Sequence, residues 1–391
     1  MDAAEAICDG TVDQLAALQE GSLTRRVGDR FGMLETIREF ARDRLDGTDE
    51  LGTMRDRHAR YFHDWALTKR EQRTKRDAPF DFLGDDAPNA EQAMGYLVEQ
   101  PSTDAALELA CEMWRSWAAQ GRLAEGDDWM TQSLARADQG NLALWEDGLS
   151  VAGEFARFRG DHERGLRLKG EAVAIARQLG MLGEVAANLK DMGEIETGRG
   201  NLVEARRLIE EALALRRRLG WPHGIAHALV GLSEVELSEA RLDSAITVLD
   251  EALAIGRAEG LIRSPDTDLG ALVLIRLGEA QRRIGNLDLA TDLITEGVEV
   301  ALDLQIVDAV RIGLEEMAAI HAARGDAERA TRLLGAATRS LRETGYVDET
   351  STERSLTESA LASAMGHDRY QVSFEAGSQM TLAEAVNLAL G

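Results

Sequence analysis

Four glutamates recur at one register of this sequence, and carboxylates repeated at a fixed spacing can bind a cation or accept hydrogen bonds. Each glutamate directly follows a small residue and precedes a turn-like pair by six positions. The four are Glu154, Glu194, Glu234 and Glu279. In one interpretation the four glutamates form an acidic ladder, a row of carboxylates along a ligand-binding groove. In the other, each forms an ion pair with a nearby arginine such as Arg157, Arg282 or Arg283. An exposed pair contributes only about 0–1 kcal/mol, and the sequence leaves both alternatives open.

Basic residues fall on the same predicted face, so we expect a groove of mixed charge. A peptide or a polar small molecule would suit such a groove. The predicted ligand-binding residues are Glu154, Glu194, Glu234, Glu279, Lys190, His227, Arg276 and Arg115.

Two other groups of residues could bind a ligand or a metal. Trp114, Trp117, Trp129 and Trp145 lie within 32 residues; we expect them to form the core of the first repeat rather than a platform that stacks a ring or sugar, because Trp114 falls at the helix-packing register. His223 and His227 have the i, i+4 spacing that permits zinc, but no cysteine or fourth ligand lies nearby. We therefore predict no metal and no cofactor. No nucleophile and base can be assembled either, so no catalytic residue is predicted and we do not expect an enzyme.

The elements that position these residues follow from a period in the turns. Turn-like pairs begin at steps of 39, 40, 40, 45 and 40 residues. The long step contains Leu261–Leu269, whose Ser-Pro and Asp residues indicate a lengthened loop. The turns are Gly121-Arg122, Gly160-Asp161, Gly200-Asn201, Ala240-Arg241, Gly285-Asn286 and Gly325-Asp326.

Small residues after the turns indicate that each unit is a helical hairpin. Alanine stands five positions after each of the last four turns, where two antiparallel helices would approach closely. These alanines are Ala205, Ala245, Ala290 and Ala330. With 5 prolines in 391 residues and abundant Ala, Leu, Glu and Arg, the chain is predicted to be all-α. Such hairpins bury their apolar faces only by stacking, so we expect six from about Thr103 to Gly345 in a right-handed solenoid.

The pattern G-x6-G-[DN]-x3-A, clearest at Gly193/Gly200/Ala205 and Gly278/Gly285/Ala290, resembles the tetratricopeptide repeat with lengthened helices. HEAT-type repeats have a similar period and remain the alternative. The resemblance implies that the first helix of each hairpin lines a concave binding surface.

Four further stretches carry a second resemblance. "RFGMLETIREFA" (30–41), "RHARYF" (57–62), "GRLAEGDDWM" (121–130) and "MTLAEAVNLAL" (380–390) resemble STAND-class regulatory ATPases, including LuxR-type and MalT-like bacterial regulators. In that family a nucleotide-binding module and a winged helix precede a tetratricopeptide sensor. The resemblance implies that the N-terminus is the tail of the winged helix.

Local patterns agree with that parsing. Leu34, Ile37 and Phe40 recur at helical spacing, and the residues before them alternate around Gly28-Asp29 as in a β-hairpin. The phosphate-binding motif G-x4-G-K-[ST] is missing, so we expect no ATPase chemistry and a chain that represents the sensor and scaffold portion.

Four regions are predicted from these patterns. They are a winged-helix remnant (1–46), a helical connector and linker (47–100), the tetratricopeptide-like repeats (101–345) and C-terminal capping helices (346–391). Within them, Asn89 with Gln92 and Thr381 with Glu384 are expected to cap helices.

Composition limits the partners and the compartment. A net charge of −25 repels nucleic acid over most of the surface, and no apolar run approaches the roughly 18 residues that span a bilayer. Cys8 and Cys111 are the only cysteines and cannot form a disulfide framework, and the N-terminus is acidic, so a cytoplasmic location is expected. Two functions remain: a sensor that binds a small-molecule or peptide effector for a bacterial transcriptional or signalling regulator, or a protein-protein scaffold.

Overall fold

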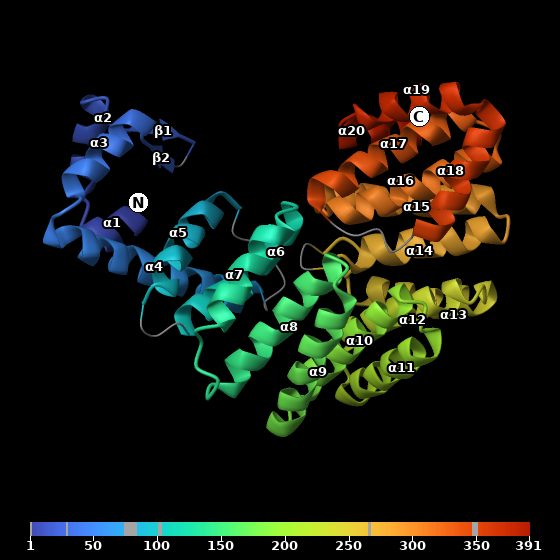
Figure 1. Cartoon of the computed structure of the whole chain (residues 1–391), viewed down its shortest axis with the longest axis horizontal. Coiled ribbons are helices and arrows are strands. Elements are labelled where there is room, and N and C mark those ends of the chain that lie inside the picture. The colour runs from blue at the N-terminus through green and yellow to red at the C-terminus, as the bar shows by residue number, and fades with distance from the viewer. Residues whose placement is uncertain (1, 29, 74–83, 101–103, 265–266, 346–350) are drawn as a thin grey trace.

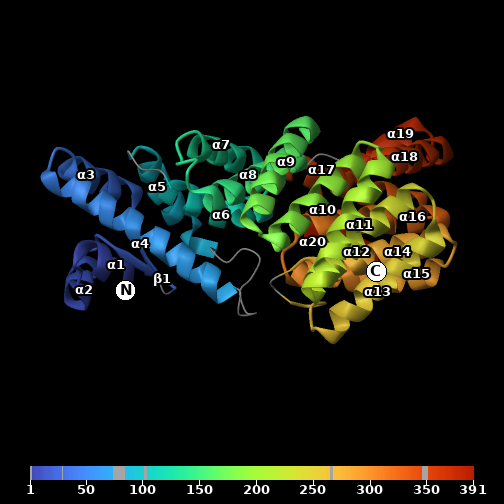
Figure 2. The same ribbon diagram turned by 90° about the horizontal axis from the view of Figure 1, so that it is seen from below.

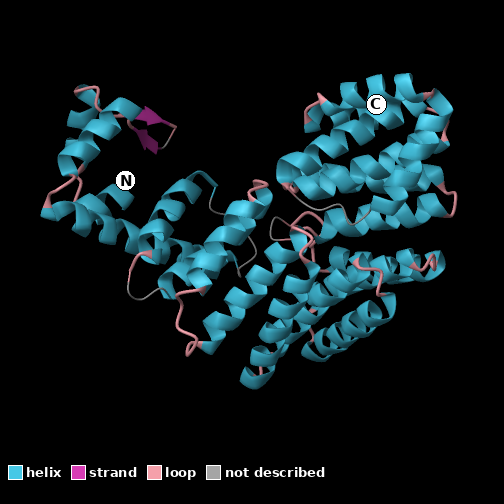
Figure 3. Ribbon diagram, in the orientation of Figure 1, coloured by secondary structure: helices cyan, strands magenta, loops and turns pink. Residues whose placement is uncertain are grey.

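The computed structural model describes residues 2–28, 30–73, 84–100, 104–264, 267–345 and 351–391. Within them nearly all regular structure is helical, and helical hairpins stack side by side along the chain (Figures 1 and 3). Figure 2 shows the N-terminal elements at one end of this array and the C-terminal helices at the other. The predicted all-α hairpin solenoid is confirmed.

The N-terminal part contains a short β-hairpin followed by a helix, as predicted. The hairpin pairs Arg25 with Gly32 and Val27 with Arg30 in antiparallel register. No residue of α2 or α3 is buried, and Phe40 is 60% exposed. The elements are α1 (Asp2–Cys8), α2 (Val12–Glu20), β1 (Arg25–Val27), β2 (Arg30–Gly32) and α3 (Glu35–Leu45). Nothing in this geometry tests the winged-helix assignment, which stays a prediction.

Two connector helices join this part to the repeats and share a hydrophobic core with the first hairpin. Phe62 of α4 (Asp49–Arg73), Met94 of α5 (Ala87–Val98) and Trp117 of the first hairpin are buried in one cluster. Between α4 and α5 lies a short 3-10 helix (Gly84–Asp86); the rest of the predicted linker, residues 74–83, lies outside the described residues.

Six helical hairpins make up the described repeat region. They are α6 (Asp104–Ala119) with α7 (Leu123–Leu134), α8 (Leu142–Phe158) with α9 (His162–Leu179), α10 (Leu182–Gly198) with α11 (Leu202–Leu219), α12 (Pro222–Ser238) with α13 (Leu242–Ala258), α14 (Leu269–Arg283) with α15 (Leu287–Asp303), and α16 (Val307–Ala323) with α17 (Ala327–Thr344). The lengthened loop falls between α13 and α14, although its Pro265 and Asp266 lie outside the described residues.

All six predicted turns join the two helices of a hairpin, and their first residue has positive φ. At Gly200 φ is +76°, and at Ala240, the one non-glycine among the six, φ is +56°. The residue after each turn residue donates its N–H to a carbonyl five positions back, as Asn201 does to Glu196 at 2.8 Å. This closing bond ends a helix with a left-handed residue, which explains the preference for glycine.

Close helix crossings explain the repeated glycine and alanine of the motif. A Cβ on Gly193 would lie 2.4 Å from Ile209 Cγ1 and 3.1 Å from the Ala205 carbonyl oxygen. At Gly278 the corresponding distances, to Ile294 Cγ1 and the Ala290 oxygen, are 2.4 and 3.2 Å. The motif therefore specifies a crossing within each hairpin, and all four predicted alanines are fully buried.

Three helices cover the C-terminal end: α18 (Ser351–Met365), α19 (His367–Ser378) and α20 (Leu382–Leu390). The backbones of α17 and α19 meet at two glycines, since a Cβ on Gly335 would lie 2.2 Å from the Phe374 oxygen and one on Gly377 2.0 Å from the Arg332 oxygen. The predicted capping box of Thr381 and Glu384 is confirmed.

The predicted cap at Asn89 is wrong. The helix begins earlier, at Ala87 with Pro88 in its first turn, so Asp86 is the residue that precedes it. The Asn89 amide nitrogen instead donates to Asp86 Oδ1 at 3.0 Å. Proline suits the first turn because the N–H that it lacks has no partner there.

The first and last hairpins touch. A Cβ on Gly121, in the turn between α6 and α7, would lie 2.8 Å from the Cα of Thr344 at the end of α17. The two helix ends lie side by side in Figure 1. The array thus curls until its ends meet around the inner face of the solenoid.

None of the described helices combines the length and the low polarity that crossing a bilayer requires.

Candidate functional site

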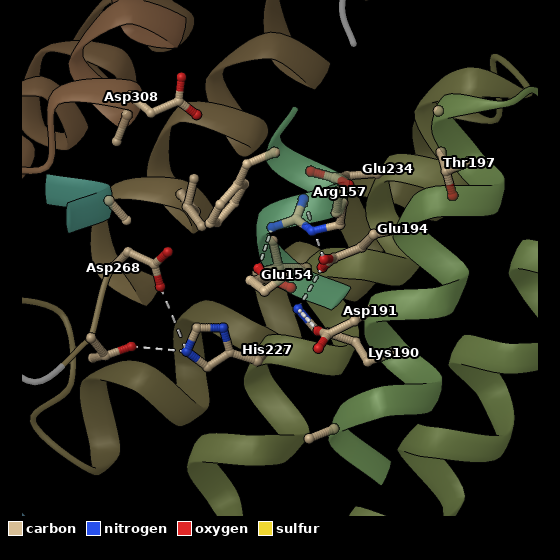
Figure 4. Close-up of a pocket in the computed structure, with 18 of the residues that line it drawn as sticks. Glu154, Arg157, Lys190, Asp191, Glu194, Thr197, His227, Glu234, Asp268 and Asp308 are labelled. Carbon is tan, nitrogen blue, oxygen red and sulfur yellow. Dashed lines mark hydrogen bonds and ion pairs between the residues drawn. The ribbon is translucent and has the colours of Figure 1, made fainter. Parts of the chain in front are cut away.

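A cavity of about 1120 Å³ lies along the inner face of the hairpins. Its walls come mainly from the first helices, α6, α8, α10, α12, α14 and α16, as expected for the concave face of a repeat solenoid. Lys169 of α9 and Arg216 of α11 also reach it from second helices. Figure 4 shows part of this cavity.

All eight predicted ligand-binding residues line this one cavity. They are Arg115 on α6, Glu154 on α8, Lys190 and Glu194 on α10, His227 and Glu234 on α12, and Arg276 and Glu279 on α14. The register argument therefore places them correctly, while their role in binding stays a prediction.

Ion pairs hold the four glutamates, as the pairing alternative predicts. Glu154 accepts from Arg157 at 2.6 Å, and Glu194 lies 2.8 Å from Lys190 Nζ. Arg276 bridges Glu234 and Glu279, at 3.0 Å from each. The ladder is therefore not a row of free carboxylates.

Of the proposed arginine partners, Arg157 and Arg283 pair with these glutamates. Arg282 Nε lies 2.8 Å from Glu316.

The sequence does not predict one buried residue of the cavity lining, Lys169. The Lys169 side chain is 2% exposed, and its Nζ lies 2.5 Å from Asp191 and 3.4 Å from Glu154. A Cβ on Gly153 would lie 2.8 Å from Lys169 Cγ, so this glycine makes room for the lysine stem. Register reasoning confined to the first helices does not find Lys169; the glycine facing it is the signal that could have.

The electrostatics of this cluster bind α8, α9 and α10 together. Burial alone would raise the pKa of Asp191, but Lys169 and Lys190 outweigh it and lower that pKa far below its usual range. Burial would likewise lower the pKa of Lys190, yet Glu194 and Asp191 raise it. Both groups are therefore charged at neutral pH, and in Figure 4 their side chains lie beside Glu194 and Arg157.

Charge is almost balanced around the cavity. Nine acidic and eight basic side chains are among its described lining residues, although the chain as a whole carries −25. The cavity is therefore far less acidic than the molecular surface, and it offers hydrogen-bond partners of both signs to a ligand.

The tryptophans divide between core and cavity. Trp117 is fully buried, whereas Trp114 is partly exposed and lines the cavity with the Arg115 guanidinium 4.9 Å from its ring centre. The predicted core role of Trp114 is thus only partly right. Trp129 and Trp145 pack partly buried against the same core.

His223 and His227 both lie on the cavity wall. The ring centres of His223 and His227 are 4.7 Å apart, and His227 Nε2 lies 2.8 Å from Thr267 Oγ1 and 3.9 Å from Asp268. Within the described residues no group of three or more His, Cys, Asp or Glu side chains is arranged to hold a metal ion.

Comparison with known proteins shows which repeat family and which folds this chain resembles. A tetratricopeptide repeat family profile matches residues 184–258, from α10 to the end of α13. No curated protein sequence matches the chain significantly.

Two solved structures are similar over most of their length. A Rap protein complexed with Competence and Sporulation Factor shares 12% identity over 96% of this chain and 94% of that chain, with a TM-score of 0.61. The apo form of RapI shares 12% identity over 73% of this chain and 98% of that chain, with a TM-score of 0.56. The fold is a tetratricopeptide-like helical solenoid. At such identities the likeness shows the fold alone.

A STAND protein with a tetratricopeptide repeat sensor, from Pyrococcus horikoshii, shares 14% identity over 97% of this chain and 59% of that chain. Its TM-score of 0.45 is too low to support the predicted relationship to that class.

Proposed function

We propose that this tetratricopeptide-like solenoid is a non-enzymatic sensor that binds a short peptide, or a polar small molecule of similar size, in its inner cavity. The main support for this proposal is the cavity. The first helices of the six hairpins line one space of about 1120 Å³. That exceeds the roughly 300–1,000 Å³ of ordinary small-molecule sites. The mixed lining suits a ligand with both donors and acceptors, such as a peptide backbone.

The regulatory context is part of the same proposal. The sequence resemblance to STAND-class bacterial regulators, including LuxR-type and MalT-like members, favours a cytoplasmic sensor that passes ligand binding to another module. The similar Rap structure was solved with Competence and Sporulation Factor, which supports a ligand-binding role for a solenoid of this shape.

Non-enzymatic function is favoured by the pairing of the cavity charges. Lys190 and Arg276 are each held by carboxylates, which raise the pKa of both groups. A paired and strongly stabilised charge is a poor general acid or base, because its pKa lies far from neutral pH.

The test is retention of peptides by the purified chain. A pool of random pentapeptides is incubated with the protein, and retained peptides are identified by mass spectrometry after gel filtration. Ala187 lines the cavity from α10, and Ala214 is exposed on α11. We expect Ala187→Trp to weaken retention by placing a bulky side chain in the cavity and Ala214→Trp to leave it intact.

Both substitutions replace a helical alanine by the same bulky residue, so their cost in helix propensity is matched. Equal retention by both variants would exclude the cavity as the binding site. A wild-type chain that retains no peptide but binds a defined partner protein would favour the scaffold alternative.

A further inference from the structure

One corner of the cavity is cationic, and among the described residues its most buried side chain, that of Arg216, has no carboxylate within ion-pair distance. Arg216, in the last turn of α11, is 4% exposed and lines the cavity. Its Nη1 donates to the Gly224 carbonyl oxygen at 2.7 Å, while its Nε is buried without an acceptor among the described residues. The guanidinium carbon lies 5.9 Å from the centre of the Trp221 ring. We call Arg216, His223 and His227 the basic corner.

Six other cavity cations differ from Arg216. Those with a carboxylate within 4 Å are Arg157, Lys169, Lys190, Arg276, Arg283 and Arg311. The described part of the chain places no carboxylate within that distance of Arg216. Asp191 and Glu194 act on it only at longer range, so a buried guanidinium faces the cavity without an ion pair, an arrangement that costs stability unless a partner arrives.

The charges around His227 show that positive groups converge here from several helices. Burial lowers the pKa of His227 well below its ordinary value, and His223, Lys190, Arg216 and Arg115 lower it further. These groups come from α12 itself, α10, α11 and α6. The opposing carboxylate is Asp268, just before α14 and 3.9 Å from Nε2, beside the uncharged Thr267.

We propose that the basic corner binds a carboxylate group of the ligand that occupies the cavity, an inference that rests on the proposed function. A guanidinium offers paired N–H donors that match the two oxygens of a carboxylate. His223 and His227 supply further donors beside it, and Trp221 forms an apolar wall. A peptide would present such a group at its C-terminus or on an acidic side chain.

The corner also has carboxylates around it, since Asp191, Glu194 and Asp268 lie near the same groups. Carboxylate is the anion proposed, because an unmodified peptide carries carboxylates and no phosphate.

An anion beside His227 stabilises the imidazolium form and raises the His227 pKa in the complex relative to the free protein. Affinity should therefore rise as pH falls toward the His227 pKa of the complex, because the bound state then holds more protons than the free state.

The experiment follows the 7 histidines of the full chain by NMR with histidine-selective labelling. N-acetylglycine, which mimics a peptide C-terminus, is titrated at pH 6 and 8, with the neutral N-acetylglycinamide and inorganic phosphate as comparisons. We expect N-acetylglycine to shift the His223 and His227 signals saturably, at least as tightly at pH 6 as at pH 8, and the amide to leave them unchanged. Equal shifts from both glycine compounds, no shift from either, or tighter binding of phosphate would overturn the proposal.

Adjacent arginines provide the matched variants. Arg217 follows Arg216 on α11 but points outward, with a half-exposed side chain paired with Glu251 at 2.8 Å. Arg216→Met should weaken N-acetylglycine binding about tenfold or more, and Arg217→Met should not change it. Equal effects of the two variants would refute the site.

Since Arg216 is buried, its variant also needs a substitute if it fails to fold. His227→Gln, followed through the His223 signal, should weaken N-acetylglycine binding; an unchanged affinity would contradict the assignment.

Failure here and failure of the proposed function are distinguishable. Loss of the N-acetylglycine response with peptide retention still sensitive to Ala187→Trp removes the basic corner but keeps the cavity as the binding site.

Discussion

At the scale of single residues, the inner face consists of charges that neighbouring repeats neutralise for each other. Lys169 on α9 is held by Asp191 on α10, and Arg276 on α14 by Glu234 on α12. Removing one member of a buried pair leaves the other charge unsatisfied, which costs more than the pair contributes. These pairs therefore specify how adjacent hairpins align.

The double substitution Glu194→Gln with Glu234→Gln tests this role. It removes carboxylates from Lys190 and Arg276, although Asp191 and Glu279 remain as partners. We expect a loss of about 1–3 kcal/mol in the free energy of unfolding, measured by thermal and urea melts. The exposed glutamates Glu204 and Glu251 replaced together by Gln should cost less than about 1 kcal/mol.

The same double variant tests the cavity as a binding site. Because both glutamates line it, peptide retention should fall. An unaltered retention would assign Glu194 and Glu234 to structure alone.

Glu146 makes the stability of the α8–α10 contact dependent on pH. Its side chain is 2% exposed and accepts from Asn188 Nδ2 at 2.9 Å. Burial, with Asp147 and Glu184 nearby, raises its pKa from 4.5 to about 7. Between these values the unfolded chain loses the proton that the folded chain keeps. The contribution of Glu146 to stability is therefore present below pH 4.5 and falls by up to about 3 kcal/mol as pH rises past 7.

Glu146→Gln should remove this dependence. Relative to wild type, the variant should gain free energy of unfolding at pH 8 compared with pH 5, by about 2–3 kcal/mol. Urea unfolding at both pH values measures the difference, with Glu171→Gln on the exposed face of α9 as the control. A difference between variant and wild type that is equal at both pH values would contradict the prediction.

At the scale of elements, each hairpin depends on a turn residue in the left-handed conformation. Five of the six turn residues are glycine, and Ala240 adopts the same conformation with φ of +56°. A side chain at positive φ costs about 1 kcal/mol. The α12–α13 turn is therefore the one in which sequence and geometry disagree.

Exchanging glycine and alanine at two turns should shift stability in opposite directions. Ala240→Gly should raise the free energy of unfolding, and Gly200→Ala, at φ of +76° with open space around its Cβ position, should lower it. We expect about 0.5–1 kcal/mol in each case, measured by urea melts. A loss of stability in Ala240→Gly would show that the turn tolerates alanine without strain.

The packing of α19 on α17 depends on two glycines for a different reason. A Cβ on Gly335 or Gly377 would collide with backbone oxygen atoms, which cannot rotate away. Either alanine substitution should cost about 2–4 kcal/mol and loosen the C-terminal helices, as measured by melting and hydrogen exchange. Gly170→Ala is the matched control, because its Cβ meets nothing within 4 Å and helix propensity favours alanine.

These elements also show what the sequence could and could not predict. The turn period is enough to place six hairpins, because a left-handed turn is a local requirement. The pairing of Glu234 with Arg276 joins residues 42 positions apart, and Lys169 enters from a second helix. Such contacts depend on how repeats stack, which periodicity alone does not specify. The groove face was therefore predictable, whereas its ion pairs and the basic corner were not.

At the scale of the whole molecule, the contact of Gly121 with Thr344 brings the first and last hairpins together. Gly121→Ala should separate them and enlarge the radius of gyration measured by small-angle X-ray scattering, since its Cβ would lie 2.8 Å from a backbone atom. Gly180→Ala carries the same positive-φ cost, at +72°, and its Cβ would meet nothing within 4 Å, so it should leave the radius unchanged. Equal radii in the two variants would mean that this contact does not hold the array closed.

That contact also changes how the array should unfold. In an open row of repeats, each unit is stabilised only by its immediate neighbours, so the ends fray first and independently of each other. The contact between the first and last hairpins adds a stabilising free energy that links units far apart in the row. Fraying of α17 then removes support from the α6–α7 turn, and the reverse holds as well. Amide protons at the two ends should therefore open as one cooperative unit, with a common free energy of exchange.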